Sequence, residues 1–165
     1  MAKSEDALKE AFAGESQANR KYLAFAAKAD QEGYAQAARL FRAAAAAETI
    51  HAHNHLRALK AIRSTRENIQ EAVAGETHEF KAMYPAMIES AKAEGNKEAE
   101  RSFNYANEVE KVHARLYEQM LVDLAAAGAT YPYYVCPVCG YTAEAEAPEV
   151  CPVCGAKGKM FSKVE

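Results

Sequence analysis

The stretch from residue 5 to residue 127 limits the fold more than any other feature, because it contains few residues that break a helix. It is rich in Ala, Glu, Lys, Leu, Arg and Gln, which are strong helix formers. Gly33 and Gly95-Asn96 mark two turns, and a capping box at residues 64–67 marks a helix start after a break near residues 62–64. The sequence therefore predicts four helices, over residues 5–31, 34–62, 66–94 and 97–127.

Apolar side chains recur at helical spacing within these segments, for example at Leu8, Phe12 and Tyr22. Four amphipathic helices of similar length predict a mostly α fold built on a four-helix bundle. Pro85 lies inside the third predicted helix, where it removes an amide donor. It should either kink that helix or accompany a bulge, and the sequence leaves both possibilities open.

The second half of the helical stretch repeats the first. The sequence Ala-Gly-Glu that ends at Glu15 occurs again ending at Glu76. The motif Glu48-x-x-His51 recurs as Glu110-x-x-His113, at an offset one residue longer than that of the Ala-Gly-Glu copies. The chain therefore contains two copies of one helical hairpin, each forming half of the bundle.

Carboxylates and imidazoles follow the pattern of di-iron and di-manganese bundle proteins, in which two helices each supply a Glu and the other two each supply Glu-x-x-His. Glu and His three residues apart project from one helix face, so each pair can bind one metal ion. Distances along the sequence from the turns place these side chains near the middle of the bundle. The candidate metal ligands, which are also the candidate catalytic residues, are Glu15, Glu48, His51, Glu76, Glu79, Glu110 and His113.

Most Glu residues in Ala/Glu/Lys-rich helices lie on solvated faces, and the acidic residues here could do the same. Glu15, however, lies on the apolar stripe that contains Phe12 and Tyr22. Burying five carboxylates without cations would cost many kcal/mol, whereas two divalent metals would remove that cost. Tyr22 and Tyr84 can reach the same region and donate hydrogen bonds to metal-bound carboxylates, although core packing also explains them.

Beyond Gly128 the composition changes to short Val and Tyr segments around four cysteines. We place a boundary at about residues 128–134, between a bundle over residues 1–130 and a small domain over residues 131–165. The cysteines form two Cys-Pro-Val-Cys knuckles, which in a chain without an export signal indicate a tetrathiolate metal site; they are Cys136, Cys139, Cys151 and Cys154. Zinc and iron both fit this spacing, and the neighbouring carboxylate site favours iron because a one-electron relay would serve it.

Length and charge exclude several classes of function. A chain of 165 residues has room for one ordinary domain and a small appendage. Its 20 basic and 23 acidic residues give a net charge of −3 without a basic stripe, so nucleic acid is not an expected partner. No apolar run approaches the ~18 residues of a membrane span, and the charged N-terminus has no signal segment, so we expect a cytoplasmic protein that does not enter a membrane.

Taken together, these motifs resemble the rubrerythrin family, whose members join a ferritin-like di-iron bundle to a C-terminal rubredoxin-like domain. The resemblance covers nearly the whole chain and rests on the segments AFAGESQANRKY, AETIH, AGETHEFKAMYP, EVEKVH and CPVCGYTAEAEAPEVCPVCG. It implies a ferritin-like four-helix bundle followed by a rubredoxin-like, metal-bound β domain. It also implies a di-iron centre in the bundle and one iron bound by the four cysteines.

The resemblance further implies a non-haem di-iron peroxidase that reduces hydrogen peroxide to water in oxidative-stress defence. In the family, one iron exchanges a Glu ligand for a His on reduction, and these roles would fall here to Glu79 and His51. Electrons would enter through the rubredoxin-like iron from a donor protein, either a rubredoxin or an NAD(P)H-dependent reductase. Two alternatives stay open: an iron-handling protein that oxidises Fe(II) for storage or detoxification, and a zinc-ribbon interaction module on a structurally metallated bundle.

The link between the second and third helices departs from family members in which a long crossover runs along the bundle. Only a few residues near positions 62–66 are available, whereas spanning ~40 Å would need at least about 12 extended residues. The bundle is therefore either a simple up-down-up-down one or one in which two chains exchange helix pairs. We expect the exchanged homodimer, in which Glu15, Glu48 and His51 of one chain face Glu76, Glu79, Glu110 and His113 of the other.

Overall fold

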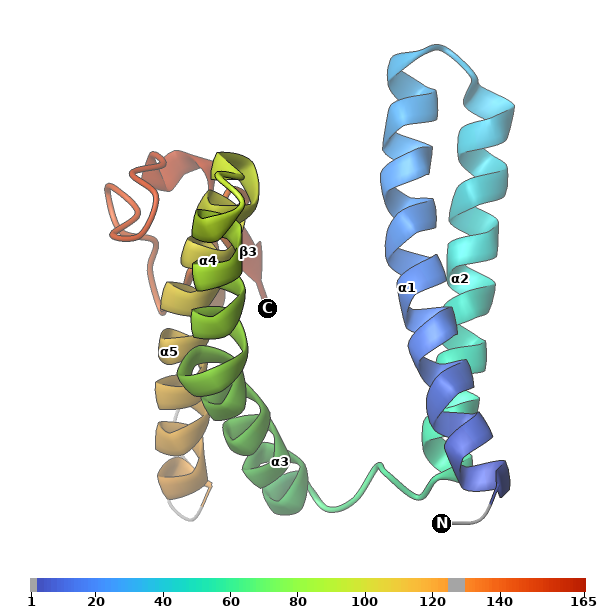
Figure 1. Ribbon diagram of the computed structural model, residues 1–165, viewed down its shortest axis with the longest axis horizontal. Coiled ribbons are helices and arrows are strands. Elements are labelled where there is room, and N and C mark those ends of the chain that lie inside the picture. Colours follow the sequence, from blue (N-terminus) through green and yellow to red (C-terminus); the bar gives the residue numbers. More distant parts are fainter. Residues whose placement is uncertain (1–2, 125–129) are drawn as a thin grey trace. The chain divides into compact units, whose positions relative to one another are not determined.

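The computed structural model describes residues 3–124 and 130–165. The chain divides into two compact units, Met1–Arg63 and Ser64–Glu165. Each unit contains a pair of antiparallel helices joined by a short turn, as Figure 1 shows. Among the described residues, no helix is both long enough and apolar enough to cross a membrane.

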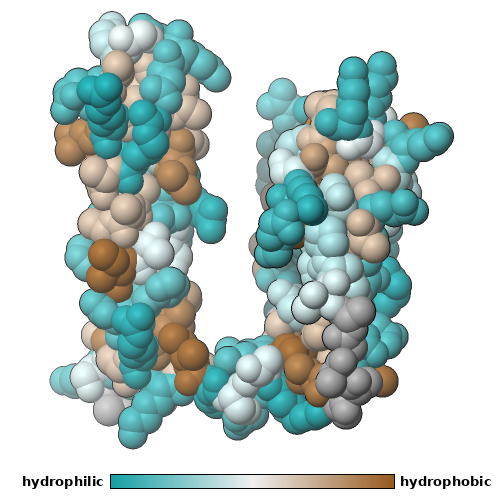
Figure 2. Space-filling model, turned by 180° about the vertical axis from the view of Figure 1, so that it is seen from behind, coloured by the Kyte–Doolittle hydropathy of each residue, from teal (hydrophilic) through white to brown (hydrophobic). Residues whose placement is uncertain are grey.

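The first unit is a hairpin of α1 (Lys3–Gln31) and α2 (Ala35–Ala58), with its turn at Gly33 as the sequence predicts. Among the described residues of this unit, the buried side chains are all alanines, at positions 26, 29, 38, 45 and 52. Larger apolar side chains stay exposed, including Phe25 at 47% and Leu40 at 68%, and Figure 2 shows such hydrophobic side chains among hydrophilic ones on the surface. The hairpin alone therefore buries too little large apolar surface to form a complete core.

The second unit begins with α3 (Thr65–His78), the π-helical turn η1 (Glu79–Met83) and α4 (Tyr84–Ala93), which pack together along α5 (Lys97–Asp123). The predicted capping box is present, because Ser64 N–H donates to the Glu67 carboxylate at 3.1 Å and Ser64 Oγ accepts from Glu67 N–H. The Asn96 side chain caps α5. Both helix starts are therefore fixed by local hydrogen bonds that the sequence encodes.

The π-helical turn explains a change in the spacing of the internal repeat. The offset between Tyr22 and Tyr84 is one residue longer than the offset between Glu15 and Glu76, so the second copy has one extra residue in between. A π turn closes hydrogen bonds one residue further along the chain than an α-helix does, and Tyr84 N–H indeed donates to the carbonyl oxygen of Glu79. The extra residue is thus absorbed within the helix instead of forming a loop.

Several helix limits differ from the prediction. The helix predicted over residues 34–62 ends at Ala58, because the next residues form a turn in which Lys60 has a φ of 53°. The helix predicted over 66–94 is interrupted by η1, and Pro85 follows this turn directly, so Pro85 accompanies a bulge. The predicted helix end at residue 127 lies outside the described residues, as does part of the predicted boundary at 128–134.

The C-terminal part of the second unit is a small antiparallel sheet with the strand order β2-β1-β3. Its strands are β1 (Tyr133–Val135), β2 (Thr142–Glu144) and β3 (Ser162–Val164), and the 3₁₀ turn η2 (Gly158–Met160) precedes β3. Strand β2 contacts α5. This contact sets the cysteine knuckles beside the helix that carries Glu110 and His113.

Candidate metal centres

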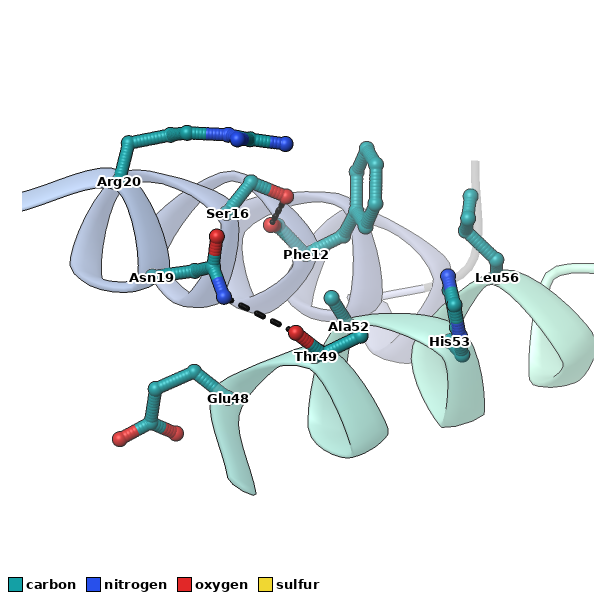
Figure 3. Close-up of a pocket in the computed structure, with 9 residues that line it drawn as sticks. All are labelled: Phe12, Ser16, Asn19, Arg20, Glu48, Thr49, Ala52, His53 and Leu56. Atoms are coloured by element: carbon teal, nitrogen blue, oxygen red, sulfur yellow. Dashed lines mark hydrogen bonds between the residues drawn. The ribbon is translucent and has the colours of Figure 1, made fainter. Parts of the chain in front are cut away.

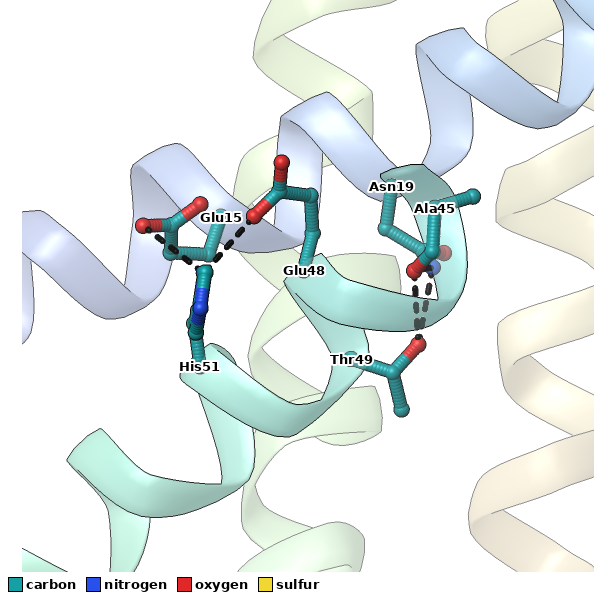
Figure 4. Close-up of polar contacts among 6 residues, drawn as sticks. All are labelled: Glu15, Asn19, Ala45, Glu48, Thr49 and His51. Carbon is teal, nitrogen blue, oxygen red and sulfur yellow. Dashed lines mark hydrogen bonds and ion pairs between the residues drawn. The ribbon is translucent and has the colours of Figure 1, made fainter. Parts of the chain in front are cut away.

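The first cluster of ligand-type side chains lies between α1 and α2 and contains Glu15, Glu48 and His51. His51 Nδ1 is 2.8 Å from Glu48 Oε2 and 3.8 Å from Glu15 Oε1. Figure 4 shows the three side chains converging from the two helices. The His51 side chain is 52% exposed, so the cluster lies at an open face of the hairpin.

A polar clamp holds α1 against α2 one turn away from this cluster. The Asn19 side-chain amide donates to the carbonyl oxygen of Ala45 at 2.7 Å and to Thr49 Oγ1 at 2.9 Å. Figure 3 shows this contact in a groove of about 240 Å³ that His53 also lines, with the Glu48 carboxylate pointing away from the contact. The clamp fixes the register of the two helices and so the distance between Glu15 and Glu48.

The second cluster contains Glu76, Glu110 and His113 and lies between α3 and α5. His113 Nδ1 is 2.7 Å from Glu110 Oε2 and 3.9 Å from Glu76 Oε2. These two distances nearly equal the corresponding 2.8 Å and 3.8 Å of the first cluster. The repeat in the sequence is thus also a repeat of geometry, and each hairpin presents the same arrangement of two carboxylates and one imidazole that could hold a metal ion.

The carboxylates of the second cluster are held where their negative charge is unfavourable. Burial first, and then the hydrogen bond and charge of Glu110, raise the pKa of Glu76 to about 7. Burial and the charge of Glu110 also raise the pKa of Glu79, although His78 and His113 oppose this. Carboxylates crowded in this way are stabilised by a bound cation, which supports the metal-site interpretation over a solvated face.

Glu79 lies in the π-helical turn η1 and is not a member of the tight three-residue cluster. Its pKa nevertheless responds to Glu110 and His113, so the carboxyl lies within electrostatic range of both. Glu79 is therefore a third candidate carboxylate of the second half, at a position where the first half has none. π turns of this kind are frequent at functional sites.

The two tyrosines occupy equivalent positions of the repeat. Tyr22 packs on Phe41 with ring centroids 6.1 Å apart, and Tyr84 packs on Phe103 at 6.3 Å. Burial, together with the charges of the nearby carboxylates, raises the pKa of the Tyr84 hydroxyl. Tyr84 therefore keeps its proton at neutral pH and can donate a hydrogen bond to a carboxylate.

The four cysteines meet as predicted. Cys136 Sγ is 3.6 Å from Cys154 Sγ, and Cys139 Sγ is 3.5 Å from Cys151 Sγ. Disulfide bonds are about 2.05 Å long, whereas ligands at ~2.3 Å around a tetrahedral metal lie roughly 3.8 Å apart. The sulfur atoms therefore have the spacing of a tetrathiolate site.

Backbone amides surround these sulfur atoms. Burial, the largest single effect, opposes ionisation of Cys136, but hydrogen bonds from the amides of Cys139 and Val138 and from the Cys154 and Cys139 thiols together outweigh it, and the pKa of this thiol falls to about 7. The two knuckles have matching turns, in which Gly140 N–H donates to Cys136 O at 3.0 Å and Gly155 N–H donates to Cys151 O at 2.9 Å. Both glycines have a clearly positive φ, 84° and 77°, which favours Gly at these two positions.

One residue that touches the second cluster, Thr142, was not predicted from the sequence. Thr142 Oγ1 lies 3.0 Å from His113 Nε2, on the side of the ring opposite the carboxylates. Thr142 and His113 also line a pocket of about 530 Å³ together with Glu76 and Tyr133. A contact between residues so far apart in the chain has no local sequence signal, and only the packing of β2 on α5 reveals it.

Family models match both parts of the chain. The model described as rubrerythrin matches residues 6–121, and the model described as the rubredoxin-like domain of rubrerythrin matches residues 134–162. The chain belongs to the rubrerythrin family. Rubrerythrin-2 of Clostridium acetobutylicum is 40% identical to it over 94% of both chains, and nigerythrin of Nitratidesulfovibrio vulgaris is 38% identical over 84% of this chain and 75% of its own.

Solved structures support the same relationship. Nigerythrin in a partially reduced state and in a fully reduced, all-ferrous state matches 99% of this chain and 88% of its own, at 35% identity and a TM-score of 0.61. These matches confirm the predicted fold class, a ferritin-like four-helix bundle with a small rubredoxin-like domain. As a member of the family, the chain is an oxidoreductase of oxidative-stress defence with a di-iron centre and a rubredoxin-type Fe(Cys)₄ site.

Proposed function

We propose that this rubrerythrin is a non-haem di-iron peroxidase, in which residues 131–165 form an electron-accepting domain and residues 1–130 form the peroxide-reducing domain. The observation that carries the proposal is the contact of β2 with α5, which joins the tetrathiolate site to the helix bearing Glu110 and His113. A dedicated electron relay suits an enzyme that is re-reduced after every turnover. A storage subunit has no need of one.

In the proposed site, carboxylate and imidazole side chains bind the di-iron centre, and the four cysteines bind the third iron. When bound and reduced, the di-iron centre supplies two electrons to hydrogen peroxide, whose O–O bond breaks to give two water molecules with the uptake of two protons. Tyr84 keeps its proton and lies within electrostatic range of Glu79, Glu110 and Glu76, so it can donate a hydrogen bond to a carboxylate there. The proposed iron ligands are Glu15, Glu48, His51, Glu76, Glu79, Glu110 and His113, with Cys136, Cys139, Cys151 and Cys154 in the second site.

The two histidines have different surroundings, and this difference supports the proposed exchange of Glu79 for His51 on reduction. In the single chain the His51 side chain is 52% exposed, whereas that of His113 is 27% exposed and has a close polar contact at each ring nitrogen. A ring with contacts at one nitrogen, such as the Nδ1 contacts of His51, can turn at lower cost than a ring with contacts at both. His113 is accordingly the permanent ligand in this proposal.

We further propose that each complete site combines the Glu15 half of one chain with the Glu76 half of a second chain. The link between α2 and α3 contains only residues 59–64, which reach about 20 Å at most and exclude a crossover along the bundle. Exposed Phe25 and Leu40 require a second helix pair as cover. The homodimer with exchanged helix pairs satisfies both conditions.

Electrons would come from a rubredoxin or an NAD(P)H-dependent reductase, in a cytoplasm that keeps the four thiols reduced. The test is anaerobic stopped-flow mixing of the fully reduced, iron-loaded protein with hydrogen peroxide or with air-saturated buffer, while the ferric-thiolate colour is followed. Fast reoxidation by peroxide and slow reoxidation by dioxygen are expected. Fast reaction with dioxygen alone would indicate an iron-oxidising protein. A colourless rubredoxin-like domain that contains zinc would refute the proposed electron relay.

A further inference from the structure

Thr142 belongs to the rubredoxin-like domain, yet its side chain reaches the di-iron half-site. Its hydroxyl Oγ1 lies 3.1 Å from the carbonyl oxygen of Gly140, to which it donates, and 3.0 Å from His113 Nε2. A hydroxyl has one proton to donate, so Oγ1 faces the imidazole with a lone pair. When the hydroxyl donates to Gly140, the proton of this second hydrogen bond sits on His113 Nε2.

The position of that proton decides which nitrogen of His113 can bind a metal. A neutral imidazole that is protonated at Nε2 has its lone pair at Nδ1. Nδ1 is the nitrogen that faces the carboxylates, 2.7 Å from Glu110 and 3.9 Å from Glu76. The hydrogen bond to Thr142 thus selects the tautomer whose free nitrogen points into the cluster.

The position of Thr142 is fixed by packing on both sides. It is the first residue of β2, whose partner across the strand pair is Val135 of β1. Gly140, which accepts its hydroxyl proton, lies against α5, since a Cβ at Gly140 would be 3.8 Å from Val109 Cγ1, and Val109 is only 2% exposed. The hydroxyl is therefore held at the imidazole by the docking of the domain on α5.

We propose that Thr142 is a positioning residue of the di-iron site, which holds His113 in the Nδ1-binding tautomer and so couples docking of the rubredoxin-like domain to metal binding in the bundle. This inference rests on the proposed role of His113 as a ligand. Groups that orient metal-binding histidines in this way typically contribute about 10- to 100-fold to metal affinity. The carboxylate site should therefore lose affinity when the hydroxyl is removed, although Thr142 touches no metal itself.

The test uses the full-length protein, labelled with ¹⁵N-histidine and loaded with Zn²⁺ in both kinds of site so that it is diamagnetic. Thr142→Val removes the hydroxyl and keeps the branched side chain that suits a strand, whereas Thr142→Ser keeps the hydroxyl. Ser162→Ala, which removes an exposed hydroxyl from β3 of the same sheet, is the matched control. The readouts are the Nε2–H signal of His113 and the Zn²⁺ affinity of the carboxylate site, measured by chelator competition.

In the wild-type protein we expect Nδ1 ligation and a protected Nε2–H on His113. Thr142→Val should lose this protection and weaken the carboxylate site about tenfold or more, with four-cysteine binding unchanged, and Thr142→Ser should restore both. Ligation through Nε2, or a Thr142→Val protein with wild-type affinity and protection, would overturn the inference. Neither readout involves peroxide, so a protein that passes this test and does not reduce peroxide refutes the proposed peroxidase alone.

Discussion

Exchange of helix pairs between two chains can be tested by restoring a site from two inactive variants. One variant, Glu48→Ala/His51→Ala, lacks ligands in the first hairpin, and the other, Glu110→Ala/His113→Ala, lacks them in the second. His51 lies 2.8 Å from Glu48, and His113 lies 2.7 Å from Glu110. Each double variant therefore lacks both members of one such pair, and in a homodimer of that variant every site is damaged. Neither variant should bind a di-iron centre alone.

Co-expression of the two variants gives a different result in the two architectures. In an exchanged heterodimer, one site combines the intact first hairpin of one chain with the intact second hairpin of the other. Random pairing makes about half of the dimers mixed, each with one intact site out of two, so the preparation should regain about a quarter of the wild-type sites. Without exchange every site contains one damaged half, and nothing is regained.

The assay counts di-iron sites per chain and peroxide consumed per chain after anaerobic reduction. Each variant alone should keep its helical circular dichroism and its ferric-thiolate colour, because the changed residues lie outside the hydrophobic contacts and the cysteine knuckles. A mixed preparation that stays at the level of the separate variants, although mass spectrometry shows mixed dimers, would refute the exchange and leave the simple up-down-up-down bundle.

Three further outcomes are expected. Cys139→Ser should abolish turnover with NAD(P)H-linked donors but leave a chemically reduced di-iron site that consumes one equivalent of peroxide in a single turnover. Gly158→Ala should destabilise the rubredoxin-like domain by more than about 2 kcal/mol and bleach its ferric colour while α-helical dichroism persists, because a Cβ there would lie 2.0 Å from the carbonyl oxygen of Pro148. The folded protein raises the pKa of Glu76 to about 7, so the unfolding free energy of the metal-free protein should fall as the pH rises from about 4.5 to 7, and Glu76→Gln should flatten this dependence in chemical denaturation.

Local signals in the sequence were sufficient for the elements of the fold. The capping box at Ser64 and the turns at Gly33 and Gly95-Asn96 all occur where the sequence predicts them. These features work through hydrogen bonds and backbone angles within a few residues, so they can be read without tertiary information. The end of α2 at Ala58 was misplaced because residues 59–62 have acceptable helix formers and no strong stop signal.

The clustering of ligands was predictable because metal sites in bundles use a fixed spacing, Glu-x-x-His, on one helix face. The contact of Thr142 with His113 could not be predicted, because it depends on how a small sheet packs on α5. The position of the inserted residue could be predicted, but the structure that accommodates it could not. The lengthening of the repeat offset by one residue locates an insertion, but a loop, a kink and a π turn can all accommodate it.

Two departures from symmetry separate the half-sites that the repeat would otherwise make equal. The π turn brings Glu79 into electrostatic range of the second cluster, and Thr142 gives His113 a second hydrogen bond. The first cluster keeps the basic geometry, with a His51 side chain that is 52% exposed. The proposed site, in which one metal would keep its ligands while the other would exchange Glu79 for His51, needs one restrained and one freer imidazole. A duplicated hairpin acquires this difference through a single inserted residue and a hydroxyl from the docked domain.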